Sequence, residues 1–143
     1  MNYTNEMVLE FDSMSQNESF ARIVVAAFVA QLDPTMEEIA DIKTAVSEAV
    51  TNAIIHGYQN QEGKIKLFCG ILGRTVHVEV EDTGVGIENL ELAMEPFYTT
   101  KPEQERSGMG FAFMEAFMDS LKVVSEPDKG TRVIMEKNIA TST

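Results

Sequence analysis

Two polar side chains, Glu48 and Asn52, stand four residues apart in the run SEAVTNAIIHGY. In a helix this spacing places both on one face, one turn from each other. An amide oxygen can ligate a hard cation such as Mg²⁺, and a carboxylate can orient or deprotonate a hydroxyl group. The pair could therefore support group transfer, although a Glu and an Asn on a helix also fit a solvated face.

The turn DTGVGI, at residues 82–87, directly follows a segment that alternates between apolar and polar residues. Asp82 stands where that expected strand ends, and its carboxylate could accept a hydrogen bond from an amino group such as that of adenine. Gly84 and Gly86 allow backbone geometry that a Cβ would forbid. Alone, the pattern also fits an ordinary turn that contains an aspartate.

A second glycine pair, Gly108 and Gly110 in SGMGF, stands where an apolar helical pattern begins. Helix N-termini present unpaired N–H groups and the positive end of the helix dipole, so they bind anions such as phosphate. The run lacks the G-K-[ST] of a Walker A loop, and no β-α-β unit surrounds it as in a Rossmann loop. By itself, it also fits a loop that simply meets a helix.

Composition narrows the possible function classes. The 143 residues predict one domain, and a net charge of −12 argues against sequence-independent binding of nucleic acid. A single cysteine, Cys69, excludes an internal disulfide and fits a reducing compartment, and it cannot form a metal cluster with His56 and His77. The apolar run 23–30 is shorter than the roughly 20 residues needed to span a bilayer, and no signal peptide is evident. We therefore expect a cytoplasmic protein without membrane contact.

Hydrophobic periodicity predicts the first half of the chain. A strand is expected over residues 6–11. A capping box from Ser15 to Glu18 predicts the start of a helix that ends at Asp33-Pro34. A second capping box, from Thr35 to Glu38, predicts a helix that runs to about His56, with Gly57 as its stop. The expected apolar stripe of the first helix is Phe20, Ile23, Val24, Ala27 and Phe28.

In the second half the period changes to that of strands. Residues 64–72 and 75–82 predict a hairpin that turns at Gly73-Arg74. Residues 88–107 lack periodicity, which is typical of a lid or mobile loop. A helix is expected over about 109–119, followed by two strands joined by the turn PDKG. In that helix Phe111, Met114, Phe117 and Met118 are predicted to be core residues.

The element order predicts an α+β two-layer sandwich, with helices on one face of a mixed, mainly antiparallel sheet. In this order, E-x-x-x-N on a helix, D-x-G-x-G after a strand and G-x-G at a helix start resemble the ATP-binding domain of the GHKL superfamily, which has the Bergerat fold. The runs ESFARIVVAAFVAQLDPT and FYTTKPEQERSGMGF resemble, within that superfamily, the small serine kinases that act as anti-sigma factors. The resemblance covers almost the whole chain.

The resemblance implies a role for each matching position. Asn52 would ligate the Mg²⁺ that bridges the ATP phosphates, and Glu48 would be the general base. Asp82 would accept from the adenine amino group, helped by Thr131, and residues 88–107 would form the ATP lid. The other positions implied to bind nucleotide are Gly84, Gly86, Thr99, Thr100, Lys101, Arg106, Ser107, Gly108, Met109 and Gly110.

The resemblance also implies partners. Residues 1–31 would form the dimerisation and sigma-docking region of a homodimer, with Arg22 as a contact to the sporulation sigma factor F. The kinase would phosphorylate a serine of an anti-anti-sigma factor. Two alternatives stay open: a general-stress anti-sigma kinase with nearly the same site, and a nucleotide-gated binding module with negligible catalysis.

Overall fold

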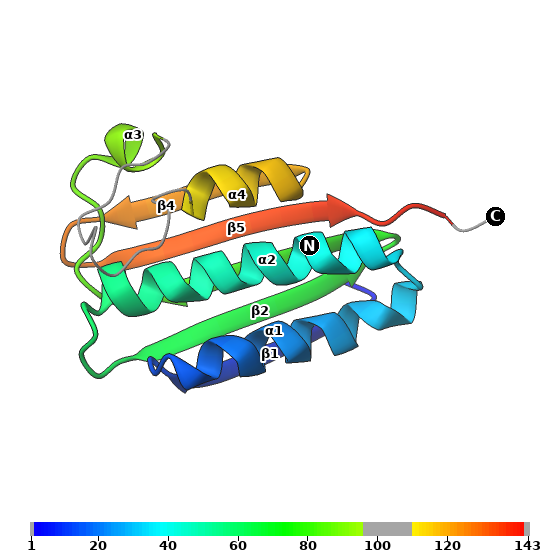
Figure 1. Cartoon of the computed structure of the whole chain (residues 1–143), viewed down its shortest axis with the longest axis horizontal. Coiled ribbons are helices and arrows are strands. Elements are labelled where there is room, and N and C mark those ends of the chain that lie inside the picture. Colours follow the sequence, from blue (N-terminus) through cyan, green and yellow to red (C-terminus); the bar gives the residue numbers. More distant parts are fainter. Residues whose placement is uncertain (1, 96–109, 142–143) are drawn as a thin grey trace.

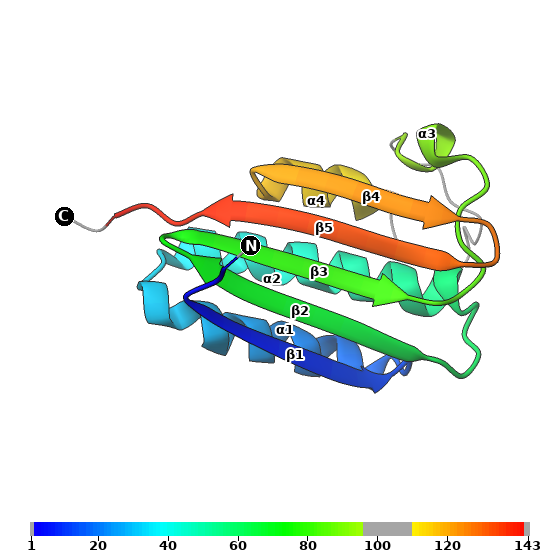
Figure 2. The same cartoon turned by 180° about the vertical axis from the view of Figure 1, so that it is seen from behind.

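The computed structural model describes residues 2–95 and 110–141, and it shows one five-stranded sheet with helices on one of its faces (Figures 1 and 2). The strands lie in the order β1–β2–β3–β5–β4, and all four pairings are antiparallel. The predicted α+β two-layer arrangement is confirmed. The parallel pairing that a mixed sheet would contain is not found among the described residues. The strands are β1 (Asn5–Asp12), β2 (Lys64–Leu72), β3 (Thr75–Asp82), β4 (Ser120–Glu126) and β5 (Gly130–Asn138).

Two long helices and one short one cover the sheet. They are α1 (Gln16–Val29), α2 (Met36–Asn52) and α4 (Gly110–Phe117); η1 (Ala30–Leu32) extends α1, and η2 (Ala53–Gly57) extends α2 by a π-helical turn. α2 lies over the middle of the sheet, between α1 and α4 (Figure 1). The predicted stop at Gly57 and the predicted hairpin turn at Gly73 are both confirmed, and Gly73 has a φ of 63°.

The start of α2 has the predicted capping box. The Thr35 hydroxyl accepts from the Glu38 N–H at 3.0 Å, and the Glu38 carboxylate accepts from the Thr35 N–H at 2.8 Å. The box predicted at Ser15 is wrong: Ser15 has helical backbone angles (φ −57°, ψ −30°) and makes no side-chain cap. A capping side chain reaches the first-turn N–H groups from an extended backbone, which Ser15 does not adopt.

The predicted stripe of α1 is wrong, because none of its five residues is buried and only Val24 and Phe28 are half-buried. Ala21, Val25 and Val29 are buried, whereas Phe20 is 50% exposed and Ile23 is 61% exposed. Residues 23–30 are all apolar, so their periodicity does not select a face of the helix.

The core lies between the sheet and the helices. Alternate residues of β2 and β3 point into it, and so do residues one turn apart on α2. Of the core residues predicted for the helix at about 109–119, Met114 and Met118 are buried, whereas Phe111 and Phe117 are half-buried. Further core side chains are Ile42, Val46, Val50, Ile65, Leu67, Cys69, Val76, Val78 and Val80.

The described part of the segment predicted as an irregular lid, residues 88–95, contains a short helix that the sequence did not predict. This helix, α3 (Leu90–Ala93), is capped by the side chain of Asn89, which accepts from the Leu92 N–H at 3.1 Å. The rest of the predicted lid, from residue 96, lies outside the described residues. Within the described part of the chain, no helix combines the length and apolarity needed to span a bilayer.

Candidate functional site

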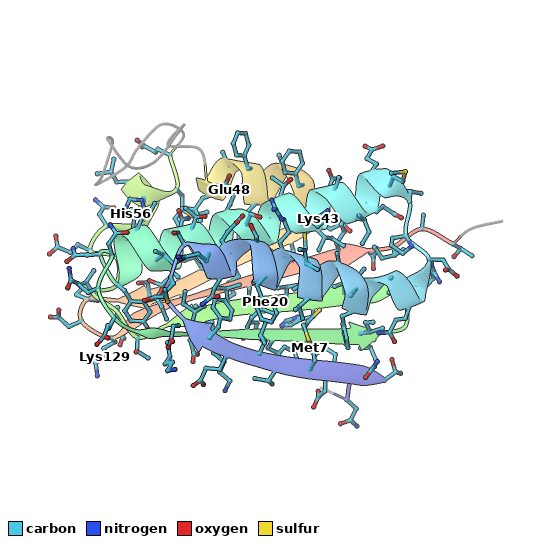
Figure 3. All side chains as sticks on the ribbon, turned by 60° about the horizontal axis from the view of Figure 1, so that its bottom comes forward. Met7, Phe20, Lys43, Glu48, His56 and Lys129 are labelled. Carbon is cyan, nitrogen blue, oxygen red and sulfur yellow. The ribbon has the colours of Figure 1, made fainter. Side chains whose placement is uncertain are left out.

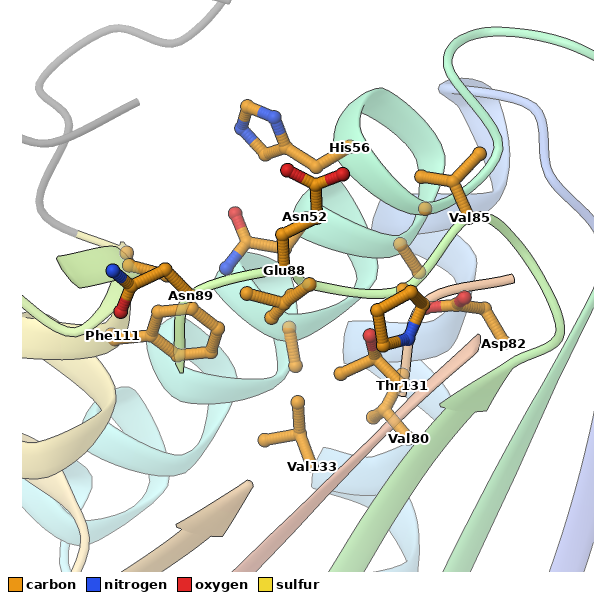
Figure 4. A pocket seen from close by; sticks show the side chains of 18 of the residues that line it. Asn52, His56, Val80, Asp82, Val85, Glu88, Asn89, Phe111, Thr131 and Val133 are labelled. Atoms are coloured by element: carbon orange, nitrogen blue, oxygen red, sulfur yellow. The ribbon is translucent and has the colours of Figure 1, made fainter. Parts of the chain in front are cut away.

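A cavity of about 670 Å³ opens where α2 and β3 end, and segments from all three sequence motifs border it. Asn52 lines it from α2, Asp82 from the end of β3, and Gly110 from the start of α4. Thr131 lines it from β5. In Figure 4, Asp82 and Thr131 lie together at one end of the cavity, and Phe111 marks the α4 end.

Asp82 is a buried carboxylate, only 6% exposed. It accepts a hydrogen bond from the Gly84 N–H at 2.9 Å and another from the Thr131 backbone N–H. Burial raises the pKa of Asp82 above its usual 3.8, although the two N–H groups act in the opposite direction. Oxygen lone pairs that the backbone leaves unused can accept hydrogen bonds from a ligand in the cavity.

The turn after Asp82 is packed directly on the end of the α2–η2 helix. A Cβ on Gly84 would lie 2.0 Å from the Gly57 carbonyl oxygen. The Val85 N–H donates to that same oxygen at 2.9 Å. Gly84 therefore holds the turn against the helix and is not among the residues that line the cavity.

The other side of this turn is held by the hairpin between β4 and β5. Gly86 has a φ of 75°, and a Cβ there would lie 2.0 Å from the Glu126 carbonyl oxygen. The Asp128 N–H donates to the Val85 carbonyl at 2.7 Å. The Ile87 N–H donates to the Ser125 hydroxyl at 2.8 Å. Both sides of the glycine turn are thus fixed to secondary structure.

Glu48 and Asn52 meet the first residue of α4. A Cβ on Gly110 would lie 3.1 Å from the Asn52 amide nitrogen and 3.3 Å from a Glu48 carboxylate oxygen. Glu48 lies one turn before Asn52 on α2, followed along the same helix by His56 (Figure 3). The structure therefore brings the acid–amide pair against the described glycine of SGMGF, although Glu48 itself is not among the residues that line the cavity.

The donor set suits a cation that brings most of its own ligands. No group of three or more His, Cys, Asp or Glu side chains among the described residues could hold a metal ion. The Asn52 carboxamide offers one hard oxygen at the cavity wall. Mg²⁺ in phosphate-binding sites keeps waters and phosphate oxygens as ligands and needs few from the protein. Asn52 alone therefore fits a nucleotide-borne Mg²⁺.

Several predicted site residues are not placed at the cavity. Arg22 lies on α1, 3.8 Å from Glu18 and 3.5 Å from the Ser19 hydroxyl, and is not a lining residue. Its buried Nε has no hydrogen-bond partner in the described part of the chain. The predicted positions that lie outside the described residues are Thr99, Thr100, Lys101, Arg106, Ser107, Gly108 and Met109.

Two residues that line the cavity, and one directly behind it, were not predicted as site residues from the sequence. His56 lines it and stands four residues after Asn52, so helical spacing could have indicated it. Phe111 also lines the cavity, but its pattern predicted core. Ser125 contacts the Thr131 hydroxyl at 2.8 Å, a contact that depends on strand register and leaves no signal in either segment alone.

Comparison with known proteins agrees with this geometry. The family description "Histidine kinase-like ATPase domain" matches residues 14–137, which include all three motifs. This chain belongs to the histidine kinase-like ATPase family. Membership in that family implies nucleotide binding, and it confirms the resemblance to the GHKL superfamily that the motifs predicted.

Relatives within the histidine kinase-like ATPases carry a more specific name. An anti-sigma F factor of Clostridium kluyveri is 65% identical over 135 residues, covering 94% of this chain and 95% of that protein. One of Clostridium perfringens is 62% identical, covering 96% and 99%. A solved structure of RsbU and RsbW domains from Mycobacterium tuberculosis has a TM-score of 0.66 at 21% identity, covering 98% of this chain and 34% of that one, and supports the fold alone. The predicted resemblance to anti-sigma factors is therefore confirmed.

Proposed function

We propose that this protein is an anti-sigma factor that binds the sporulation sigma factor F and is also an ATP-dependent serine kinase. In this proposal it phosphorylates a serine of an anti-anti-sigma factor and thereby inactivates that competitor. The names of the relatives support the anti-sigma role. Family membership supports a kinase-type ATPase domain.

The observation that carries the kinase half is the position of Gly110 against both Glu48 and Asn52. The same cavity has the buried Asp82 carboxylate at its other end. A molecule with an amino-bearing base at one end and phosphates at the other would fit this arrangement. ATP is such a molecule.

Each residue then has a role that its chemistry allows. Asp82 accepts a hydrogen bond from the adenine amino group, and Thr131 assists it. Asn52 holds the Mg²⁺, which neutralises charge on the phosphates when bound. The N–H groups at the start of α4 stabilise the negative charge of the ATP phosphates. Glu48 takes the proton of the incoming serine hydroxyl.

The proposal extends to assembly and to the whole chain. We propose that residues 1–143 act as one kinase domain and that residues 1–31 mediate dimerisation and sigma docking, with Arg22 as a sigma contact. The exposed apolar side chains of α1, Phe20 and Ile23, support an interaction on that helix. Residues 88–107 would close over the nucleotide.

The deciding experiment is a phosphotransfer assay with Mg-ATP and the purified anti-anti-sigma factor. Wild type should transfer phosphate to serine, and Glu48→Gln should lower the rate by about 10²-fold or more because it removes the base. Glu62→Gln, in an exposed loop, is the matched control and should behave as wild type. Unchanged transfer in Glu48→Gln would overturn the assignment of the base.

Two other outcomes would favour the alternatives. If ATP binds and gates sigma binding but no phosphate is transferred at saturating ATP, the protein is a nucleotide-gated binding module. If the partner it captures is a stress sigma factor, it is the general-stress kinase. Co-purification with ATP and then with ADP distinguishes these partners.

A further inference from the structure

Three polar side chains form a row across three neighbouring strands at the Asp82 end of the cavity. The register pairs Asp82 on β3 with Thr131 on β5, and Thr131 with Ser125 on β4. Residues directly opposite in a sheet point to the same face. The outermost member, Ser125, therefore lies behind Thr131 and has no part in the proposed function above.

The hydroxyl of Ser125 makes three short contacts. The Ile87 N–H donates to it at 2.8 Å, its oxygen lies 3.0 Å from the Gly130 carbonyl oxygen, and it lies 2.8 Å from the Thr131 hydroxyl oxygen. A carbonyl oxygen can only accept, so the one proton of Ser125 is needed for Gly130. The contact with Thr131 is then a hydrogen bond only if Thr131 donates.

The opposite assignment leaves a pair of oxygens without a proton. If Ser125 donated to Thr131, its oxygen would face the Gly130 carbonyl at 3.0 Å, lone pair against lone pair. Half-buried polar groups at such a distance are normally hydrogen-bonded. The arrangement in which all three contacts are hydrogen bonds therefore turns the Thr131 proton toward Ser125.

This direction determines what the cavity offers to a ligand. With its proton committed to Ser125, the Thr131 oxygen can only accept. It stands next to the Asp82 carboxylate, which also accepts when ionised. Two neighbouring acceptors favour an amino group on the ligand, and they repel a carbonyl oxygen placed at the same point.

We propose that Ser125 is a positioning residue that holds Thr131 as a hydrogen-bond acceptor and so makes the site select purine nucleotides with a 6-amino group over those with a 6-oxo group. The inference rests on the proposed ATP binding and adds a cause for base selection outside the cavity wall. In Ser125→Ala the Thr131 hydroxyl is free to turn its proton into the cavity. It can then donate to a 6-oxo group.

The test compares the dissociation constants of ATP and inosine triphosphate, measured with Mg²⁺ by isothermal titration calorimetry. Wild type should bind ATP more tightly. Ser125→Ala should lower the ratio of the inosine triphosphate constant to the ATP constant by about tenfold, which corresponds to about 1.4 kcal/mol, the order of one mispaired buried acceptor. If Ser125 only supported the local structure, its loss would weaken the binding of both nucleotides alike and leave the ratio unchanged.

Matched variants separate the effect of the hydrogen bond between Thr131 and Ser125 from other effects. Ser125→Thr keeps the hydroxyl and should keep the ratio. Ser120→Ala removes an exposed serine at the other end of β4 and should have no effect. In a Thr131→Val background, Ser125→Ala should not change the ratio further, because the acceptor that it controls is gone. If Ser125→Ala does not fold, Ser125→Cys takes its place, since a thiol accepts only weakly.

The possible results distinguish the two levels of the proposal. A lowered ratio in Ser125→Ala but not in Ser125→Thr supports the inference. An unchanged ratio in Ser125→Ala, with wild type still preferring ATP, overturns the inference and leaves ATP binding intact. Wild type that binds neither nucleotide overturns the proposed function and the inference with it.

Discussion

The Tyr58 hydroxyl accepts a hydrogen bond from the Thr83 backbone N–H at 2.8 Å and lies 2.6 Å from the Lys64 carbonyl oxygen, to which it donates. Tyr58 directly follows the helix that carries Asn52, and Thr83 directly follows Asp82. One phenol therefore connects the helix of the first motif to the turn of the second. This bond adds to the contact of Val85 and Gly84 with Gly57 in fixing the turn against the helix.

Tyr58→Phe tests that connection. It keeps the ring but leaves the Thr83 N–H and the Lys64 carbonyl without this partner, so we expect a loss of about 1–2 kcal/mol in the free energy of unfolding. ATP affinity should fall as the Asp82 turn loosens. Urea denaturation and calorimetry measure the two effects. Tyr3→Phe, on the far face of the sheet, is the control and should leave ATP affinity unchanged; equal affinities in both variants would contradict the prediction.

Gly84→Ala should be among the most damaging small substitutions. The new Cβ would lie 2.0 Å from the Gly57 carbonyl oxygen, so the turn must move away from the helix. We expect a stability loss of about 3 kcal/mol or more and a loss of ATP binding. Gly73→Ala is the matched control, because it is strained only by its positive φ and meets no atom within 4 Å. It should cost about 1 kcal/mol and leave ATP binding intact; comparable losses in both variants would show that the turn tolerates the shift.

The buried Asp82 predicts a pH dependence of ATP binding. The adenine amino group donates to the ionised carboxylate, so binding favours that form, while burial raises the pKa of the free protein above 3.8. Affinity should therefore be constant above this raised pKa and fall as the pH drops through it, with proton release on binding in that window. Calorimetry in two buffers between about pH 4 and 7 measures both. Asp82→Asn should bind ATP more weakly and should lack this pH dependence of ATP affinity. An identical pH profile in wild type and Asp82→Asn would exclude Asp82 as the titrating group.

Arg74 should matter for stability and not for nucleotide binding. Its guanidinium donates to the carbonyls of Ile139 at 3.0 Å, Leu32 at 2.7 Å and Ala140 at 2.9 Å, which ties the C-terminal residues to the end of η1. Arg74→Ala should lower the free energy of unfolding by about 3 kcal/mol, measured with urea. Arg132→Ala, with a half-exposed side chain 3.6 Å from Glu79, should change it by less than about 1 kcal/mol. A change in ATP affinity in Arg74→Ala would contradict the division between stability and binding.

Cys69 should be chemically inert in the folded protein. Its side chain is fully buried on β2, and burial raises the pKa of its thiol to about 12. At pH 8 very little thiolate is present, and reagents cannot reach the sulfur. Modification by a thiol reagent should be slow in buffer and fast in urea. Fast modification of the folded protein would mean that β2 opens readily.

The parts that sequence predicted well are those that local chemistry determines. The Thr35–Glu38 box, the Gly73 turn and the alternation of β2 and β3 each follow from a few neighbouring residues. The Asp82 turn was also found, because D-x-G-x-G after a strand is a compact pattern. These features depend little on packing against distant segments of the chain.

The parts that failed depend on packing between distant segments. Residues 23–30 are apolar throughout, so their pattern does not say that Ala21 faces inward and Phe20 outward, as packing against α2 and β1 has it. The role of Ser125 depends on its register with Thr131, which the turn PDKG does not fix by itself. The packing of Gly84 on Gly57 could not be predicted either, because no local pattern connects the two residues.

The contact between Gly84 and Gly57 has a consequence for how the sequence can change over evolutionary time. At Gly70 the atoms in the way of a Cβ belong to the Tyr3 side chain, at 2.7 Å, so a smaller residue at position 3 could compensate for Gly70→Ala. At Gly84 the obstacle is a main-chain carbonyl, which every amino acid carries. No exchange at position 57 can remove it, so a search for second-site suppressors should recover Gly70→Ala but never Gly84→Ala through residue 57.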